Sequence, residues 1–147
     1  MAFRGQAEYS IDSKGRVAIP AKMRAAASEE KRFVALYGLD ACLHLYTIAT
    51  WEQKEADLHR LNQYRAENRE AIRRLFMNTE DLETDAPGRV TLSKTLLDRA
   101  GLTAGSTARI IGAGERIEIW NPETLEAHLN KPSAESEILI DRTFGGL

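Results

Sequence analysis

Cysteine and proline are scarce in this chain. The single cysteine among 147 residues, Cys42, has no partner for an internal disulfide, which excludes the small disulfide-stapled folds of secreted proteins. Cys42 lies in an alternating apolar run, so we expect a small buried side chain. Only 4 residues are proline, whereas 43% are hydrophobic. This composition excludes a disordered chain and predicts one compact unit or two small fused ones.

Long apolar runs and an overall surplus of positive charge are also absent. No stretch reaches the roughly 20 apolar residues of a membrane span, and the first residues lack the apolar centre of a signal peptide, so we expect a cytoplasmic protein with no membrane partner. The net charge of −2 excludes a protein that is basic over its whole surface. The charges are segregated, however, with +3 over residues 1–24 and −4 over residues 115–147. The basic end can still bind a polyanion locally.

The chain repeats itself at an offset of 73 residues. The clearest match places Asp12, Gly15, Arg16 and Val17 over Asp85, Gly88, Arg89 and Val90. The same offset places Phe3 over Phe76, and one inserted residue then aligns Gly38 with Gly112 and residues 43–46 with 117–120. Because this period exceeds the roughly 20 to 50 residues of solenoid repeats, it predicts two copies of one small module with pseudo-twofold symmetry.

Each half has the same predicted order of elements: a strand, a tight glycine turn, a strand, a short helix, two alternating strands and a closing helix. In the first half we expect the short helix over residues 21–27 and a hairpin of residues 33–37 and 42–46. Thr50 followed by Gln53 matches a capping box and predicts a long helical region to about residue 74. In the second half, Asn121 before Pro122 predicts a helix that ends near Leu129.

Gly15 and Gly88 lie in the two tight turns. We expect type II turns with glycine in third place, because that position needs a positive φ, which glycine adopts without steric cost. Pro87 then stands in second place, which such turns favour.

An aspartate precedes each turn and an arginine follows it. Asp12 lies four residues before Arg16, and Asp85 lies four residues before Arg89. Each carboxylate can accept backbone N–H bonds or pair with its arginine and hold the guanidinium in a fixed orientation. A guanidinium held in this way suits recognition of phosphate or guanine.

These motifs resemble the MraZ family of bacterial transcriptional regulators. The resemblance rests on the duplicated Asp-x-x-Gly-Arg-Val motif, on Arg24, on Gly112 and on residues 117–120, and it spans about residues 3–128. It implies a β-rich α+β fold, a pseudo-twofold double-split β-barrel of two AbrB-like (SpoVT-AbrB, swapped-hairpin) modules with flanking helices. It also implies a ring-like homo-oligomer that binds short direct repeats in the promoter of the division and cell wall gene cluster, at the nucleoid.

The resemblance carries the DNA-contacting motif of the family onto Asp12, Lys14, Arg16, Asp85 and Arg89. We predict that the basic residues of this motif contact double-stranded DNA, with the aspartates as orienting residues and Gly15 and Gly88 as turn residues. Lys22 and Arg24, on the expected short helix, are further candidates to touch phosphate. The second copy has Pro87 where the first has Lys14, and Leu97 where the first has Arg24, so equal contributions from the two halves are not expected.

Other interpretations of the charged residues remain open. The Asp–Arg pairs are also what surface ion pairs of little energetic value would look like. Residues 60–74 carry five arginines and two glutamates, a local +3. That segment predicts a solvated helix face packed on the core, a second DNA contact or a subunit interface.

No pattern typical of an enzyme or a metal site is found. The three histidines, His44, His59 and His128, lie far apart in sequence without a paired cysteine, and no phosphate loop is present. We expect His44 to be packed on a strand. We therefore expect no enzyme, no cofactor and no metal.

The rival hypothesis is a protein-binding module, because AbrB-like domains also occur in antitoxins that hold a toxin through a flexible tail. The predicted organisation is a first AbrB-like module over residues 3–52, a connecting helical segment over 53–75, a second AbrB-like module over 76–129 and a tail over 130–147. Residues 133–147 contain the apolar side chains that such a tail needs. We expect a strand or frayed segment there that docks on a neighbouring subunit.

Overall fold

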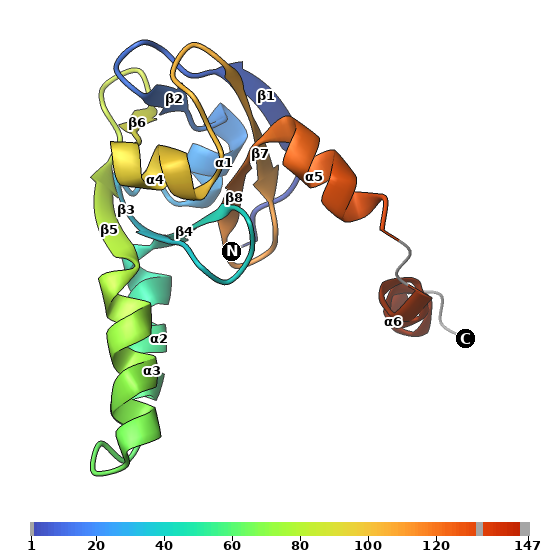
Figure 1. The fold of residues 1–147 in the computed structure, drawn as a ribbon. Helices are drawn as coiled ribbons and strands as arrows, with labels where there is room; N and C mark the ends of the chain where they lie inside the picture. Colours follow the sequence, from blue (N-terminus) through green and yellow to red (C-terminus); the bar gives the residue numbers. More distant parts are fainter. Residues whose placement is uncertain (1, 132–133, 145–147) are drawn as a thin grey trace.

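The computed structural model describes residues 2–131 and 134–144. The first half contains β1 (Gln6–Ser10), β2 (Arg16–Ala18), α1 (Ala21–Ala26), β3 (Arg32–Leu36), β4 (Leu43–Thr47) and α2 (Ile48–His59). After α3 (Ala66–Met77) come β5 (Thr79–Glu83), β6 (Arg89–Thr91), α4 (Lys94–Arg99), β7 (Thr107–Gly112), β8 (Ile117–Trp120) and α5 (Pro122–Leu129). A last helix, α6 (Ala134–Phe144), follows (Figure 1). The predicted order of elements is confirmed in both halves.

The strands form one six-stranded antiparallel sheet and one two-stranded ribbon. The sheet has the order β1-β7-β8-β4-β3-β5, and β2 pairs with β6 in the ribbon. The repeat relates β1 to β5, β2 to β6, β3 to β7 and β4 to β8. Replacing each strand by its counterpart gives the same strand order read from the other edge, so the topology has the predicted pseudo-twofold symmetry. The halves are interleaved, since β1 pairs with β7 and β5 pairs with β3. The molecule is a β-rich α+β protein whose sheet remains open, with β1 and β5 at its edges.

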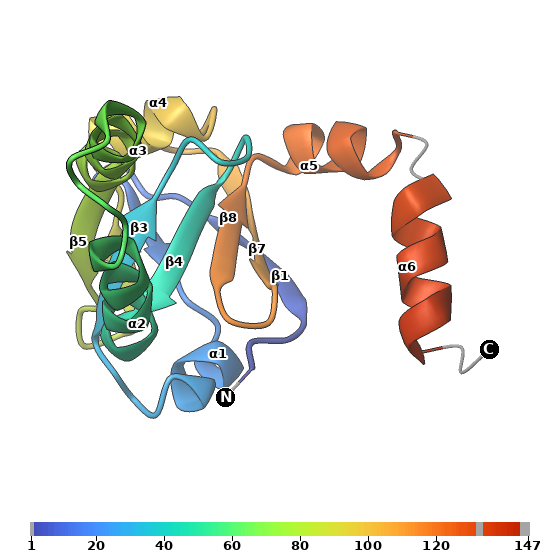
Figure 2. The same ribbon diagram turned by 90° about the horizontal axis from the view of Figure 1, so that it is seen from below.

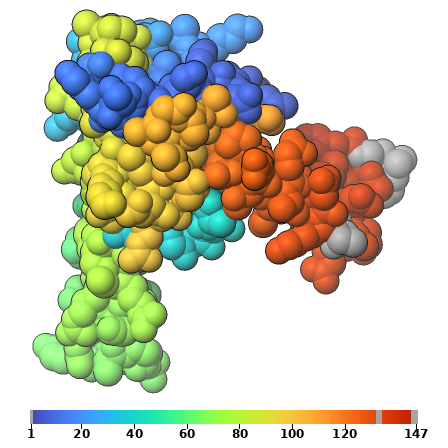
Figure 3. Space-filling view, turned by 45° about the horizontal axis from the view of Figure 1, so that its top comes forward, coloured from blue at the N-terminus to red at the C-terminus, as the bar shows by residue number. Residues whose placement is uncertain are grey.

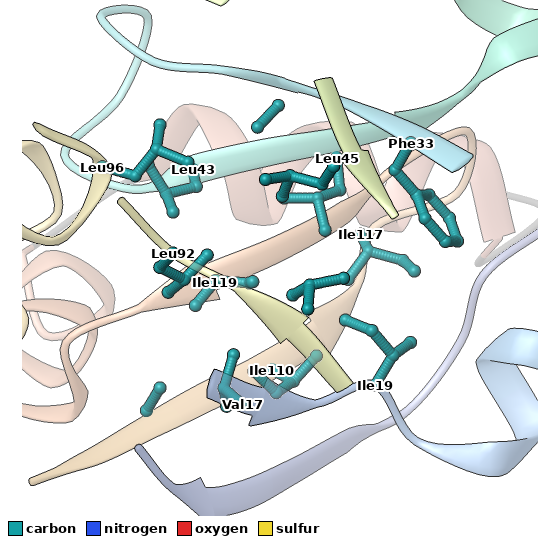
Figure 4. Packing of buried hydrophobic residues seen from close by; sticks show 14 of the residues in the cluster. Val17, Ile19, Phe33, Leu43, Leu45, Leu92, Leu96, Ile110, Ile117 and Ile119 are labelled. Atoms are coloured by element: carbon teal, nitrogen blue, oxygen red, sulfur yellow. The ribbon is translucent and has the colours of Figure 1, made fainter. Parts of the chain in front are cut away.

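The hydrophobic core lies between the sheet and the ribbon (Figure 4). Val17 and Val90 stand opposite each other in the ribbon and are fully buried against sheet residues such as Leu45, Ile117 and Ile119. Burying a side chain of this size contributes about 1.5–3 kcal/mol relative to leaving it exposed. Since neighbouring residues of a strand face opposite ways, burial of the two valines turns the residues on either side of them outward.

The helical segment after the first hairpin differs from its prediction in two respects. The predicted single helical region is instead a hairpin of two helices, α2 and α3, which are separated by a turn over residues 60–65. There Asn62 accepts a hydrogen bond from the backbone N–H of Tyr64 through its side chain and another from the side chain of Asn68 through its carbonyl. The N-cap is Thr47 and not Thr50, since the Thr47 hydroxyl accepts the Thr50 backbone N–H at 3.3 Å.

The C-terminal segment also differs from its prediction. Residues 134–144 form α6, where we expected a strand or a frayed segment; residues 133 and 145–147 lie outside the described residues. Glu135 and Glu137 in its first turn and Arg142 in its last turn complement the helix dipole and favour a helix. Figure 2 shows α6 standing apart from the sheet. Its large apolar side chains are exposed: Ile138, Leu139, Ile140 and Phe144.

Four further local predictions are confirmed: α1, the β3–β4 hairpin, the cap of α5 and the burial of Cys42 and His44. α1 ends within one residue of its predicted end, and β3 pairs with β4 as the expected hairpin. The Asn121 side chain accepts the backbone N–H groups of Glu123 and Thr124 and so caps α5. Cys42 and His44 are buried. Within the described ranges, no helix is both long and apolar enough to cross a membrane.

Candidate nucleic-acid interface

The first glycine turn is organised by the carboxylate of Asp12. Asp12 Oδ1 accepts the backbone N–H of Lys14 at 2.9 Å and of Arg16 at 2.8 Å. Asp12 Oδ2 accepts Nε–H of the Arg16 guanidinium at 2.6 Å. One carboxylate therefore fixes both the backbone of the turn and the direction of the arginine that follows it.

The second turn has the same geometry. Asp85 Oδ1 accepts the backbone N–H of Arg89 at 2.8 Å, and Asp85 Oδ2 accepts the arginine Nε–H at 2.9 Å. Pro87 stands where Lys14 stands in the first copy and has no N–H to donate, so the second carboxylate lacks one bond of the first. The two copies are thus close to equivalent at the arginine and different at the turn tip.

The prediction of type II turns with glycine in third place is wrong. The hydrogen-bonded turns run from Asp12 to Gly15 and from Asp85 to Gly88, with the glycine N–H donating to the aspartate carbonyl, so glycine is fourth and Pro87 is third. Glycine is still required, because φ is +80° at Gly15 and +88° at Gly88. A three-residue loop that ends on a left-handed glycine, here residues 13–15 and 86–88, is a common hairpin connection.

The turns keep both aspartates ionised. The backbone hydrogen bond from Arg16 is the largest influence on Asp12 and holds the pKa of its carboxyl below the ordinary value; Arg89 does the same for Asp85. A carboxyl with a depressed pKa stabilises the fold above its ordinary pKa, and this contribution is lost as the pH falls through the depressed value. At neutral pH both guanidiniums are therefore held by charged partners.

The ribbon places both arginines on one outward face. In the register of β2 and β6, Arg16 lies opposite Thr91 and Arg89 lies opposite Ala18, on either side of the buried valine pair. The Arg16 and Arg89 side chains are 32% and 34% exposed. Asp12 links the copies, since its Oδ2 lies 3.9 Å from Nη1 of Arg89. The result is a pseudo-symmetric pair of oriented guanidiniums with Nη hydrogens available for phosphate oxygens or base edges.

The other basic candidates are placed unequally. Lys14 is exposed at the tip of the first turn, and Lys22 is exposed on α1. Arg24 is half-buried; its Nε–H donates to the carbonyl of Ile19 at 3.1 Å, and its guanidinium lies against Gly88. The structure thus brings Arg24 of the first half to the turn of the second half and gives Lys22 no comparable position.

The arginine-rich segment over residues 60–74 lies elsewhere. It belongs to the α2–α3 hairpin, which projects from the end of the molecule opposite the ribbon (Figures 1 and 3). Three of its arginines pair with acidic neighbours: Arg60 with Asp57, Arg65 with Glu67, and Arg73 with Glu70. The hairpin therefore cannot share one flat surface with the ribbon.

Two features of this surface were not predicted from the sequence: the contact of Arg89 with Asp12 and the position of Arg24 at Gly88. Both join the two halves, so only the aligned repeats combined with the β2–β6 pairing could have revealed them. A separate group of ligand-type side chains was also missed. Asp40, Cys42, His44 and Glu118 offer ligand atoms that all lie within 4.8 Å of one another.

Comparison with known families agrees with the duplication. Two successive stretches of the chain, residues 2–74 and 75–144, match the family model described as "MraZ protein, putative antitoxin-like". The boundary between the matches falls in α3, so each match covers one half of the repeated structure. Together they cover nearly the whole chain, which confirms the resemblance carried by the duplicated motif. The chain belongs to the MraZ family.

Proposed function

We propose that this protein is a sequence-specific DNA-binding transcriptional regulator, without catalytic activity, that acts on the promoter of the division and cell wall gene cluster at the nucleoid. The observation that carries the proposal is the pair of aspartate-held arginines, Arg16 and Arg89, presented on one face of one β-ribbon. A two-stranded ribbon fits the major groove of B-DNA, and arginine is the side chain that most often reads guanine there. Lys14 and Arg24 add phosphate contacts at the two turns.

Assembly into a ring-like homo-oligomer reconciles DNA binding with the acidic net charge of the chain. One ribbon offers few contacts, and the four charges of its Asp–Arg pairs sum to zero. Several ribbons on one face of an oligomer hold successive direct repeats at once, so effective concentration multiplies a modest single-site affinity. The proposal includes the double-split barrel with swapped hairpins, in which the interleaved halves of one chain present both turns together.

A DNA-binding titration of the full-length protein tests this function. Fluorescence anisotropy compares the DNA upstream of its own gene cluster with a scrambled duplex of equal length and composition. We expect selective binding, higher affinity as direct repeats are added, and an affinity loss of roughly 100-fold between about 50 and about 200 mM salt, as about four phosphate contacts would give. Equal binding to both duplexes, or none at low salt, contradicts the proposal.

The second candidate is a protein-binding, antitoxin-like module. It is favoured by α6, whose apolar residues Ile138, Leu139 and Phe144 are exposed and belong to none of the buried clusters of the described part of the chain. Removing residues 132–147 separates the two functions. Loss of a co-purifying protein with unchanged DNA binding supports the antitoxin-like module, whereas unchanged partners support the regulator.

The charge of Asp12 sets the selectivity of DNA binding. Asp12→Asn keeps an oxygen for the backbone N–H groups but ends the ion pairs with Arg16 and Arg89, so Arg16 loses its fixed direction while Arg89 keeps its bond to Asp85. Ordering one such side chain costs about 0.5–1.5 kcal/mol. We expect the ratio of affinities for specific and scrambled DNA to fall about 3- to 10-fold, while scrambled DNA binds somewhat more tightly because a negative charge is gone.

The effect of Asp12→Asn on this affinity ratio is compared with that of Asp85→Asn. Asp85 forms an ion pair with Arg89 alone among the described residues, so its replacement reduces the selectivity ratio less. Asp98→Asn, which removes an exposed partner of Lys94 on α4, leaves the ratio unchanged. An Asp12→Asn ratio equal to that of Asp98→Asn shows that the arginines need no orienting carboxylate.

A further inference from the structure

A buried cluster of ligand-type side chains lies on the outer face of the sheet, away from the ribbon. His44 of β4 stands directly opposite Glu118 of β8, and the repeats align these two positions, so the pair sits at the pseudo-twofold axis. Asp40 and Cys42 approach from the β3–β4 connection. His44, Glu118 and Cys42 are 3%, 6% and 1% exposed. The side chain of Asp40 is 41% exposed and leaves a route from solvent.

The nitrogen and oxygen atoms of the cluster converge. Nε2 of His44 lies 3.1 Å from Oδ2 of Asp40 and 3.5 Å from Oε2 of Glu118. The other ring nitrogen, Nδ1, is buried without a hydrogen-bond partner in the described residues. A buried polar atom without a hydrogen-bond partner costs free energy, so such atoms are rare in folded proteins. Nε2 is therefore the ring atom that faces both carboxylates and is placed to share an ion with them.

The charged groups of the cluster carry more negative than positive charge. Asp40 and Glu118 are acidic, and the guanidinium of Arg116 lies beside Glu118, with Nε and Nη2 both 2.8 Å from its Oε2. Together these three charged groups carry a net charge of −1 beside the buried side chains of His44 and Cys42. A divalent cation with a Cys42 thiolate brings the sum to zero.

We propose that Asp40, Cys42, His44 and Glu118 bind one Zn²⁺ ion. A thiolate, an imidazole and two carboxylates are a four-ligand set suited to tetrahedral Zn²⁺ and poorly suited to Ca²⁺ or Mg²⁺, which take oxygen ligands. The ligand atoms of tetrahedral Zn²⁺ lie about 3.4 Å apart, so the present set closes by about an ångström on binding. The exposed loop residue Asp40 supplies much of that movement. Binding displaces the thiol proton of Cys42 to solvent.

The surroundings of Glu118 support this role. Its Oε1 accepts Nε1–H of Trp120 at 3.0 Å, while Oε2 is held by Arg116. Ligating carboxylates are commonly fixed in this way by outer hydrogen bonds. Three of the four ligands come from the first half of the chain and Glu118 comes from the second. The ion therefore joins the β3–β4 connection to the centre of the sheet and stabilises the folded chain independently of DNA binding.

Titration of the full-length, metal-free protein with Co²⁺, a spectroscopic substitute for Zn²⁺, tests the site directly. We expect one Co²⁺ per chain, a thiolate-to-cobalt charge-transfer band in the near ultraviolet, intense visible bands of a four-coordinate ion, and displacement by one equivalent of Zn²⁺. Zn²⁺ alone is expected to raise the unfolding temperature. A wild-type titration without the charge-transfer band, at an excess of Co²⁺ over protein, overturns the proposal.

Three variants locate the ion. Cys42→Ser, a nearly isosteric change, abolishes the charge-transfer band and weakens binding about 100-fold or more, since even outer-shell partners are worth 10- to 100-fold. Asp40→Asn, on an exposed loop that tolerates change, weakens binding by at least about 10-fold with the fold intact. The control His59→Gln removes a histidine at the end of α2 and leaves binding unchanged. Equal Co²⁺ affinity in Asp40→Asn and His59→Gln places the ion elsewhere and overturns the assignment.

Discussion

Replacing Arg16 and Arg89 together with alanine is expected to abolish selective DNA binding while leaving the fold and the oligomer intact. Both side chains are about one third exposed, and their ion pairs with Asp12 and Asp85 lie at the surface, where such pairs contribute little to stability. A well-made arginine contact to a base contributes about 1–3 kcal/mol of discrimination. Loss of both contacts lowers the affinity for the specific duplex by at least about 30-fold and leaves the weak affinity for scrambled DNA.

The matched control removes the same charge from the opposite end of the molecule. This hairpin variant carries Arg60→Ala and Arg65→Ala at the tip of the α2–α3 hairpin, where both arginines pair with acidic neighbours. We expect this variant to keep its selectivity in the same anisotropy titration, with sedimentation velocity confirming unchanged oligomer size for both proteins. The opposite result, lost selectivity in the hairpin variant and retained selectivity in the ribbon variant, moves the interface to the hairpin.

The local parts of the fold could be predicted from the sequence because their causes are local. The glycine turns, the hairpin of β3 and β4 and the cap of α5 by Asn121 depend on residues within a few positions of one another. The pairing of β1 with β7 and of β3 with β5 could not be predicted, since the sequence of a strand does not determine which strand of the other half it pairs with. The duplication predicts that two halves exist, and only long-range packing decides that they interleave.

Helix boundaries were missed where polar residues offer the backbone two choices. Thr47 and Thr50 both suit an N-cap, and the end of β4 at Thr47 decides between them. The helical prediction across residues 60–65 failed because Asn62 bonds to the backbone of the turn and competes with helix continuation. At the C-terminus we expected a strand or a frayed segment, whereas the acidic first turn of α6 favours the observed helix.

In the candidate site, too, the local contacts could be predicted from the sequence and the contacts between distant segments could not. The pairing of Asp12 with Arg16 spans four residues and was predictable, and the structure has it at 2.6 Å. The contact between Arg89 and Asp12 depends on the β2–β6 register. The metal-ligand cluster depends on the β4–β8 register, which sets Glu118 opposite His44. A search for ligand spacing along the chain misses it for that reason.

Gly112 is the position where the smallest substitution should do the largest structural damage. A methyl group there would touch the backbone of the N-terminal segment, 2.5 Å from the carbonyl carbon of Phe3 and 2.7 Å from Cα of Arg4, and closer still to the Arg4 nitrogen. That segment is held in place by the Gly112 N–H, which donates to the Gly5 carbonyl at 2.8 Å, and by paired bonds between Phe3 and Gly114. Backbone on both sides leaves no flexible atom to move aside.

Gly112→Ala is therefore expected to force residues 3–5 off β7 and to expose Phe3, which is 1% exposed in the fold. Losing a buried phenylalanine costs about 3–5 kcal/mol. For a chain of this size, that lowers the unfolding temperature by roughly 6–20 °C, measured at fixed protein concentration because oligomers unfold in a concentration-dependent way.

Gly114→Ala distinguishes this close approach from ordinary glycine strain in the same hairpin. Gly114 has a φ of +79° and nothing within 4 Å of an added Cβ, so alanine there costs only the left-handed conformation, about 1–2 kcal/mol. Gly112→Ala must therefore destabilise clearly more than Gly114→Ala in paired urea or thermal unfolding. Because the repeats align Gly112 with Gly38, whose added Cβ would meet only the side chain of Asn78, Gly38→Ala should fall between the two. If Gly112→Ala proves no worse than Gly114→Ala, the N-terminal segment is not clamped against β7, and Phe3 contributes less to the core than its burial indicates.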